Sequence, residues 1–251
     1  MTAIASGKAD LTRLARPEQN LLLASLTAAE KERLRPHMNL VDLQLGEMLY
    51  DRHETIGNVY FPTDSIVSLL YVMEDGASAE IAVIGREGVT GVELCMGNDK
   101  SSSRALVQSA GSAYRLSGSV LQNEFRRSGQ FHDRMLRYTQ ALLSQIAQTA
   151  VCNRHHTVDQ QLCRWVLLSL DRLPSNRLVM TQQLIANMLG VRREGVTEAA
   201  GKLQKLGIIR YSRGHIAVLD RDRLEERCCE CYSVVKREFD RLVAAPPREF
   251  A

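Results

Sequence analysis

The sequence predicts an α+β protein in which a region of short strands is followed by one long helix and then by a helix–turn–helix with a β-hairpin. Three observations predict this order. Short runs of β-branched and aromatic residues alternate with glycine- and aspartate-rich breaks from residue 41 to residue 116. The stretch 130–154 contains no glycine or proline. Residues 157–215 then combine helical periodicity with an excess of basic side chains.

The composition is that of a globular protein with one large or two ordinary domains. The 251 residues are 45% apolar, 24% charged and 5% aromatic, which excludes wholesale disorder. We expect no signal peptide, no membrane contact and a cytoplasmic location, because no stretch approaches about 18 uninterrupted apolar residues. Six cysteines in a chain of this length do not indicate a disulfide scaffold.

The first half is predicted to hold a helical segment and an all-β domain. Pro17 opens a leucine-rich stretch, residues 17–38, that is typical of a helix. The strand-like runs that follow have the spacing of a sandwich or barrel; they are residues 48–50, 59–61, 66–73, 79–84, 105–109 and 113–116.

The stretch 130–154 predicts a helix of about 35 Å or more with two apolar faces. A helix with two apolar faces usually packs on two bodies. One face can cover the strand domain, and a second copy of the chain is the expected cover for the other. The residues assigned to this dimer helix are Met135, Tyr138, Leu142, Leu143 and Ile146.

Residues 181–207 have the spacing of a helix–turn–helix. Thr181 is a suitable N-cap for a short first helix, and Gly190 can adopt the positive φ that the turn requires. Arg192 or Arg193 begins the second helix, which Gly207 ends at a C′ position. Residues 208–219 follow as a hairpin, or wing, with Arg213 near its tip.

The charge distribution indicates a nucleic-acid surface in the same region. Residues 157–215 contain nine basic and four acidic residues, a net charge of +5, whereas the whole chain carries +3. Side chains at the start of a recognition helix reach base edges, where Arg pairs with guanine and Glu accepts from cytosine. The candidate base-reading residues are Arg192, Arg193, Glu194, Thr197 and Glu198, and the candidate DNA-backbone contacts are Thr181, Gln182, Gln183, Lys202, Arg213 and His215.

These features together resemble the Crp/Fnr family of bacterial transcription regulators. The resemblance covers about residues 21–219 and is strongest from Thr181-Gln182 through Leu189-Gly190-Val191-Arg192-Arg193-Glu194. It implies a jelly-roll-like β-roll of the cyclic-nucleotide-binding type, a dimerisation helix and a winged helix–turn–helix. It also implies a homodimer on a pseudo-palindromic operator in double-stranded DNA, with RNA polymerase as a further partner. A base-reading Arg of several family members is replaced here by Glu198, which implies a different operator.

We divide the chain accordingly into four parts: a β-roll at 17–127, a dimerisation helix at 128–156, a winged helix–turn–helix at 157–219, and a C-terminal helical extension at 220–251.

The β-roll departs from the cyclic-nucleotide pattern of the family. Family members hold the nucleotide with a Gly-Glu pair and, about ten residues on, an Arg that binds the phosphate. The matching positions here are Gly91, Val92 and Ser103, with Arg104 one step along. Strand parity would turn Arg104 to the other face. The effector pocket is therefore degenerate, cyclic AMP binding in the family's manner is not expected, and the effector is left open.

Three cysteines near the C-terminus allow more than one interpretation. Cys228, Cys229 and Cys231 lie in one predicted added helix, where Cys228 and Cys231 fall on an apolar stripe and would serve as small packing residues. A thiol-based redox switch is the alternative. No metal site and no cofactor are predicted, because Cys152 and Cys163 are distant in sequence and give no standard zinc spacing. His155 and His156 are interpreted as favourable charges at a helix C-terminus.

The sequence argues against two other classes of function. A cupin-type enzyme needs several metal-binding histidines, but His53 is the only histidine between residues 41 and 116. No nucleophile-elbow or P-loop motif occurs, so no catalytic residues are predicted. A winged helix that binds protein is the remaining alternative, and the exposed Arg192-Arg193 pair argues against it.

Overall fold

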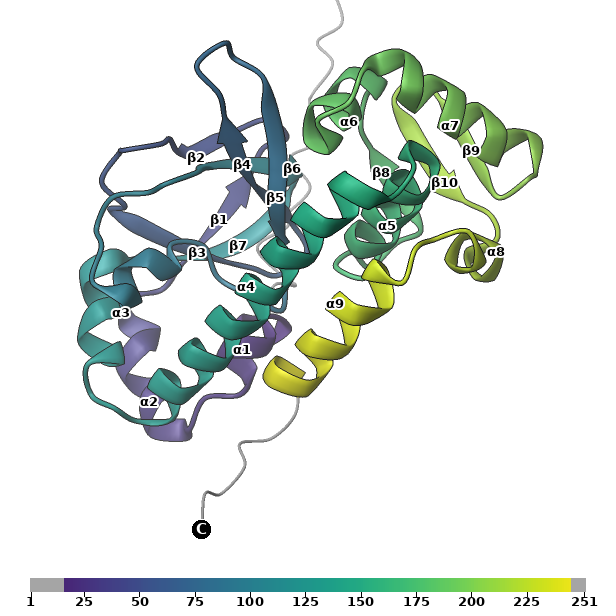
Figure 1. Cartoon of the computed structure of the whole chain (residues 1–251). Helices are drawn as coiled ribbons and strands as arrows, with labels where there is room; N and C mark the ends of the chain where they lie inside the picture. The colour runs from purple at the N-terminus through teal and green to yellow at the C-terminus, as the bar shows by residue number, and fades with distance from the viewer. Residues whose placement is uncertain (1–15, 245–251) are drawn as a thin grey trace, which may run out of the picture.

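The strand-rich region folds into a β-roll of two antiparallel sheets. The computed structural model describes residues 16–244 (Figure 1). One sheet has the order β1 (Asn39–Leu43), β7 (Gly111–Ser117), β3 (Asn58–Pro62). The other has the order β2 (Met48–Tyr50), β6 (Arg104–Ser109), β4 (Ile66–Val72), β5 (Ser78–Ile84). All six predicted strands are present, and β1 is a seventh strand that was not predicted.

The segment 17–38 is helical as predicted, but capping residues divide it into short helices. The segment is divided into η2 (Pro17–Gln19), α1 (Leu21–Ala24), α2 (Ala28–Leu34) and η3 (Arg35–His37). The Asn20 side chain accepts hydrogen bonds from two backbone N–H groups of α1 and donates to Pro62 O and Gly88 O. Thr27 then starts α2 with a capping box. These two caps, of which Asn20 is buried and Thr27 exposed, favour short helices that fit the end of the β-roll.

The long helix is present as α4 (Gln130–His155), after the short helices η4 (Val92–Met96) and α3 (Gly118–Phe125). Three residues assigned to the dimer contact, Met135, Tyr138 and Leu142, are buried within the chain itself. That assignment is corrected, because these side chains pack on the β-roll and on the C-terminal extension. Leu143 is 52% exposed and Ile146 is half-buried. The open apolar stripe of α4 consists of Leu136, Leu143, Ala147, Ala150 and Val151.

The C-terminal half forms a compact three-helix unit with a small sheet. Its elements are α5 (Val158–Leu170), β8 (Arg177–Val179), α6 (Gln182–Leu189), α7 (Arg193–Lys205), β9 (Ile209–Ser212) and β10 (His215–Val218). The strand order is β8–β10–β9. The strand β8 was not predicted, because its three residues are too few to show an alternating pattern.

The extension after the wing is not the single predicted helix. It consists of α8 (Arg221–Glu226), α9 (Cys231–Phe239) and a final π-helical turn, η5 (Asp240–Ala244). Residues 227–230 are not helical and separate α8 from α9, which then runs back beside α4 (Figure 1). Residues 245–251 of the predicted extension lie outside the described residues. This connection contains Cys228 and Cys229, and Cys231 follows it at the start of α9.

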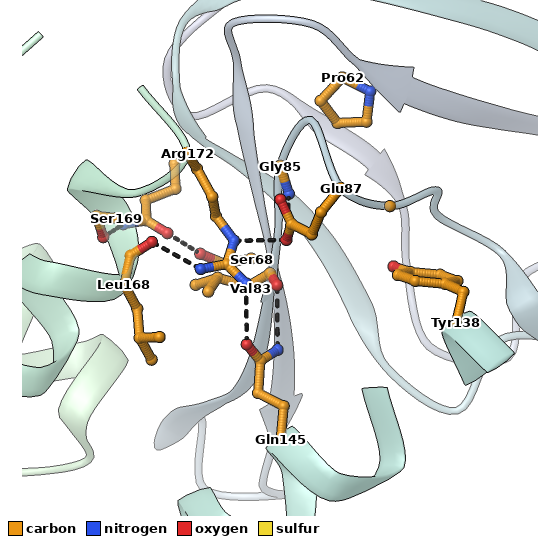
Figure 2. A network of polar contacts seen from close by, with 12 residues as sticks. Pro62, Ser68, Val83, Gly85, Glu87, Tyr138, Gln145, Leu168, Ser169 and Arg172 are labelled. Carbon is orange, nitrogen blue, oxygen red and sulfur yellow. Dashed lines mark hydrogen bonds and ion pairs between the residues drawn. The ribbon is translucent and has the colours of Figure 1, made fainter. Parts of the chain in front are cut away.

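A buried polar network joins the two halves of the molecule (Figure 2). Arg172, just after α5, donates from Nε to Glu87 Oε1 at 2.6 Å, from Nη1 to Leu168 O at 2.7 Å and from Nη2 to Gln145 Oε1 at 3.2 Å. Gln145 on α4 donates in turn to Val83 O in β5 at 3.0 Å. The β-roll, α4 and α5 are therefore held together by side chains with few alternative partners.

No helix in the range 16–244 has both the length and the apolar character that crossing a membrane requires.

Candidate nucleic-acid interface

The two helices of the predicted helix–turn–helix form as expected from their caps. The Thr181 side chain accepts from Leu184 N at the start of α6, and Gly190 ends that helix with φ +64°. Arg192 is the N-cap residue of α7, and Gly207 follows its end with φ +71°. Small and apolar residues bury the contact between the helices: Ile185, Ala186, Val196, Ala199 and Leu203.

The wing has a tight turn at its tip. Strands β9 and β10 pair from Ile209↔Val218 to Ser212↔His215. Arg213 and Gly214 form the two-residue connection, with φ of +50° and +80°, which is the conformation of a type I′ hairpin turn. This turn holds the Arg213 side chain out into solvent.

A groove of about 510 Å³ lies between α6, the start of α7 and the wing. Its lining combines polar and cationic side chains from all three elements, which are Thr181, Gln182, Gln183, Arg193, Tyr211, Ser212, Arg213 and Gly214. Five of these were predicted to contact DNA. Segments 30 residues apart in the sequence thus present their polar groups to one concave surface.

The other candidate base-reading residues surround this groove. Arg192 and Glu194 are exposed on the first turn of α7. Thr197 is also exposed, but its Oγ1 lies 2.8 Å from Gln182 Oε1, so it ties α7 to α6. His215 is exposed at the start of β10. Free side chains at the start of α7 leave this end of the helix open to a large polar ligand.

Glu198 and Lys202 lie on a different side of α7 and are engaged with each other. Lys202 Nζ is 3.0 Å from Glu198 Oε1 and 3.2 Å from Asp159 Oδ2. These two carboxylates raise the pKa of Lys202. Because its charge is already paired, Lys202 offers less to a phosphate than an unpaired lysine would.

Three groove residues were not predicted from the sequence, and they are Tyr211, Ser212 and Gly214. Tyr211 Oη donates to Met180 O at 2.8 Å, and its backbone N–H donates to Gln204 Oε1 at 2.8 Å. Both bonds fix the wing against α6 and α7. The alternation of strand β9 could have placed Tyr211 on one face with Arg213, but no signal identified that face as the groove side.

The four candidate effector residues do not converge on one ligand. Gly91 precedes η4 with φ +76°, and a Cβ there would lie 2.8 Å from Val59 Cγ1. Val92 and Ser103 are buried. Arg104 points elsewhere, because its Nε and Nη2 bind the Asp51 carboxylate at 3.0 and 2.7 Å. That ion pair lowers the pKa of Asp51, and it engages the guanidinium of Arg104.

The cysteines near the C-terminus contradict the argument from sequence spacing. Cys152, at the end of α4, lies with its Sγ 3.6 Å from Cys229 Sγ, and Cys231 Sγ lies 3.4 Å from His156 Nδ1. Hydrogen bonds with the Cys152 and Cys228 thiols lower the pKa of Cys229. The prediction of no metal-binding arrangement is therefore corrected, because the break before α9 brings Cys229 and Cys231 back to α4. Cys228 is not among the converging groups.

Comparisons with known proteins agree with this geometry. The Crp-like helix–turn–helix domain family matches residues 160–227. FixK2 from Bradyrhizobium japonicum has 19% identity and a TM-score of 0.65, over 76% of this chain and 98% of that one. A putative Crp/Fnr regulator from Eubacterium rectale has 16% identity and a TM-score of 0.64, over 82% and 96%. No curated protein sequence matches the chain.

A third solved structure is similar over the same range. It is CLP from Xanthomonas campestris, described as a regulator responsive to c-di-GMP, with 18% identity and a TM-score of 0.59 over 76% of this chain and 99% of that one. The chain therefore has a β-roll joined to a winged helix–turn–helix. More narrowly, it carries a Crp-like helix–turn–helix domain within the fold of Crp/Fnr-type regulators, which are not enzymes.

Proposed function

We propose that this protein is a transcription regulator that binds a pseudo-palindromic operator as a homodimer. The observation that carries the proposal is the groove between α6, α7 and the wing, because it collects Gln182, Arg193 and Arg213 on one exposed surface. In winged helix–turn–helix proteins the start of the second helix enters the major groove of DNA. Resemblance to Crp/Fnr regulators extends the proposal to contact with RNA polymerase at a promoter.

Each side chain has a role in this proposal. Arg193 and Glu194, with Arg192 beside them, read base edges from the first turn of α7. Thr181, Gln183 and Arg213 position the DNA backbone from the two sides of the groove. Glu198 and Lys202 contribute less to binding, because they pair with each other.

The homodimer rests on the open apolar stripe of α4. Its residues Leu136, Leu143 and Val151 are each about half exposed, whereas the opposite face of α4 is covered by the chain itself. Pairing of two such stripes would place two recognition helices on one side of the dimer. They would then meet successive major grooves about 34–36 Å apart.

The test is selection of bound sites from random double-stranded DNA with the purified protein, followed by affinity measurements on the selected site. We expect a palindrome whose half-sites lie about one helical turn apart. Arg193→Ala should weaken binding by about 1–3 kcal/mol and relax the preference at one base pair. Arg126→Ala, at an exposed position after α3, serves as the matched control.

The result is decided by sequence preference as well as affinity. If Arg193→Ala binds with unchanged base preference, α7 is not the reading helix. If no sequence is enriched at moderate salt with or without cell extract, the proposed DNA function is wrong.

A further inference from the structure

Four metal-binding side chains converge where α4 meets the C-terminal extension. They are Cys152 near the end of α4, His156 directly after it, and Cys229 and Cys231 before and at the start of α9. The three sulfur atoms and one imidazole nitrogen all lie within 4.8 Å of one another. Cys152 and Cys231 are fully buried, and Cys229 is 5% exposed. No other group of this kind occurs among residues 16–244.

Packing alone does not account for this convergence. Small apolar residues fill space with their carbon atoms, whereas here the donor atoms point at one centre. The three thiols form a cluster separate from the hydrophobic core. They also come from two segments 77 residues apart, and both segments turn sharply there: α4 ends at His155, and the chain breaks between α8 and α9.

The contacts of the His156 ring orient it so that Nδ1 faces the thiols. His156 Nδ1 is 3.4 Å from Cys231 Sγ, and Nε2 is 3.4 Å from Glu230 Oε2. A carboxylate on the far nitrogen is the usual outer contact of a metal-binding histidine, because it fixes the tautomer and ring orientation. In addition, Gln148 Nε2 donates to Cys231 Sγ at 3.0 Å, which stabilises negative charge on that sulfur.

The donor set and its size identify the ion. We propose that Cys152, His156, Cys229 and Cys231 form a structural zinc site. Three thiolates and one imidazole are a common zinc set, and tetrahedral bonds of about 2.3 Å to sulfur place ligand atoms about 3.6–3.8 Å apart. The observed separations of 3.6 Å between two sulfurs and 3.4 Å between sulfur and nitrogen fit one ion. A [4Fe–4S] cluster binds each cysteine to a different iron and needs a wider arrangement.

The charge of such a site is also accommodated. Zinc with three thiolates carries one net negative charge, so it requires a nearby cation in a buried location. Arg164 on α5 is 5% exposed, hydrogen-bonds Thr149 one turn before Cys152, and acts electrostatically on the Cys152 thiol. Four protein ligands leave no open position, so the role of the ion is structural and not catalytic.

The site lies at the junction between the two halves of the molecule. His156 lies in the short connection between α4 and α5, the first helix of the C-terminal unit. Cys229 and Cys231 lie in the segment that returns to α4. Zinc would therefore pin the C-terminal extension to the joint between the two halves. This inference does not depend on the proposed function, because the site is tested by metal content.

The experiment is elemental analysis of the full chain, purified without metal-affinity steps and dialysed against a weak chelator. We expect about one zinc per chain. Addition of Co²⁺ to protein stripped under reducing conditions should give the visible and near-ultraviolet bands of a tetrahedral cobalt–thiolate site. Cys231→Ser and His156→Ala should lose the bound zinc, and Glu230→Gln should weaken zinc affinity by about 10–100-fold.

The controls are the other cysteines. Cys228→Ser, next to the site, and Cys163→Ser, buried on α5, should keep one zinc per chain. Circular dichroism of each variant shows whether the chain is folded, and chelator should lower the melting temperature of wild type but not of Cys231→Ser. Absence of both bound zinc and cobalt bands in the folded wild type would overturn the proposal, as would full zinc content in Cys231→Ser.

Discussion

At the scale of single residues, the carboxyl group of Glu80 is the least expected buried group. Ser68 Oγ lies 2.5 Å from Glu80 Oε2 and 2.8 Å from Gln108 Oε1, and Gln108 Nε2 donates to Ser169 Oγ at 2.9 Å. One hydroxyl proton on Ser68 cannot serve two acceptors. A protonated Glu80 supplies the missing proton and completes a chain of donors from β5 through β6 to α5. Burial raises the pKa of Glu80 from 4.5 to about 7, against the opposing effects of Ser68, Arg164 and Arg172.

This protonation predicts a pH dependence. A raised carboxyl pKa means that the folded chain holds a proton which the unfolded chain releases above pH 4.5. The contribution of Glu80 to stability is therefore complete below about pH 4.5 and is lost as pH rises to about 7, by at most about 3 kcal/mol. In Glu80→Gln this slope should disappear, as measured by urea unfolding between pH 5 and 7.

Asp51→Asn is the matched control for that titration. The Arg104 guanidinium holds the pKa of Asp51 below its ordinary value, so its contribution is lost only as pH falls below that value. Between pH 5 and 7 it should shift stability by a constant amount. A Glu80→Gln profile parallel to wild type would show that Glu80 is ionised in the folded chain.

At the scale of elements, two neighbouring leucines of α4 separate the proposed dimer contact from the core. Leu143 is 52% exposed, whereas Leu142 is 3% exposed. Leu143→Glu should convert the dimer to monomer in sedimentation equilibrium with little change in monomer stability. Leu142→Ala should instead cost about 2–5 kcal/mol of unfolding free energy and leave the oligomeric state unchanged. A dimer that survives Leu143→Glu would place the interface elsewhere.

The same helix shows how far sequence reasoning extends. The caps Thr181 and Gly190 and the hairpin turn at Arg213 are local signals, and the helix–turn–helix they predict is present at those positions. The apolar pattern of α4 predicted two covered faces but not which one covers the β-roll. That choice depends on Phe239 of α9, which packs edge-on against Tyr138 and lies 101 positions further along. Likewise, no local pattern relates Cys152 to Cys229.

At the scale of the whole molecule, Arg172 links the β-roll to the DNA-binding unit. A Cβ on Gly85 would lie 2.6 Å from Arg172 Cγ, so the backbone of the β-roll is in direct contact with this side chain. Phe239 covers the guanidinium from the other side at 5.6 Å. The turn between α6 and α7 also touches the β-roll, because a Cβ on Gly190 would lie 3.3 Å from Ala79 Cβ. The two halves are therefore in direct contact at two places within one chain.

Removing one side of the buried ion pair tests this contact. Arg172→Met leaves the Glu87 carboxylate buried without its cation and should destabilise the chain by about 3–5 kcal/mol. Adding Glu87→Gln removes the second charge and should recover part of that loss in chemical denaturation. Additive effects of the two substitutions would show that the pair does not couple the halves.

The return of α9 to α4 also has a consequence in time. Cys229 follows Cys152 by 77 residues, so at about 5–20 residues per second it is synthesised roughly 4–15 s later. The two sheets of the β-roll and the helix–turn–helix are both translated before the segment that crosses back over their joint. Until then α4 exposes the face that α9 later covers in addition to its open apolar stripe, and apolar residues of both are accessible to other nascent or finished chains. The contact of α9 with α4 and α5 thus forms only after the β-roll and the helix–turn–helix have been synthesised.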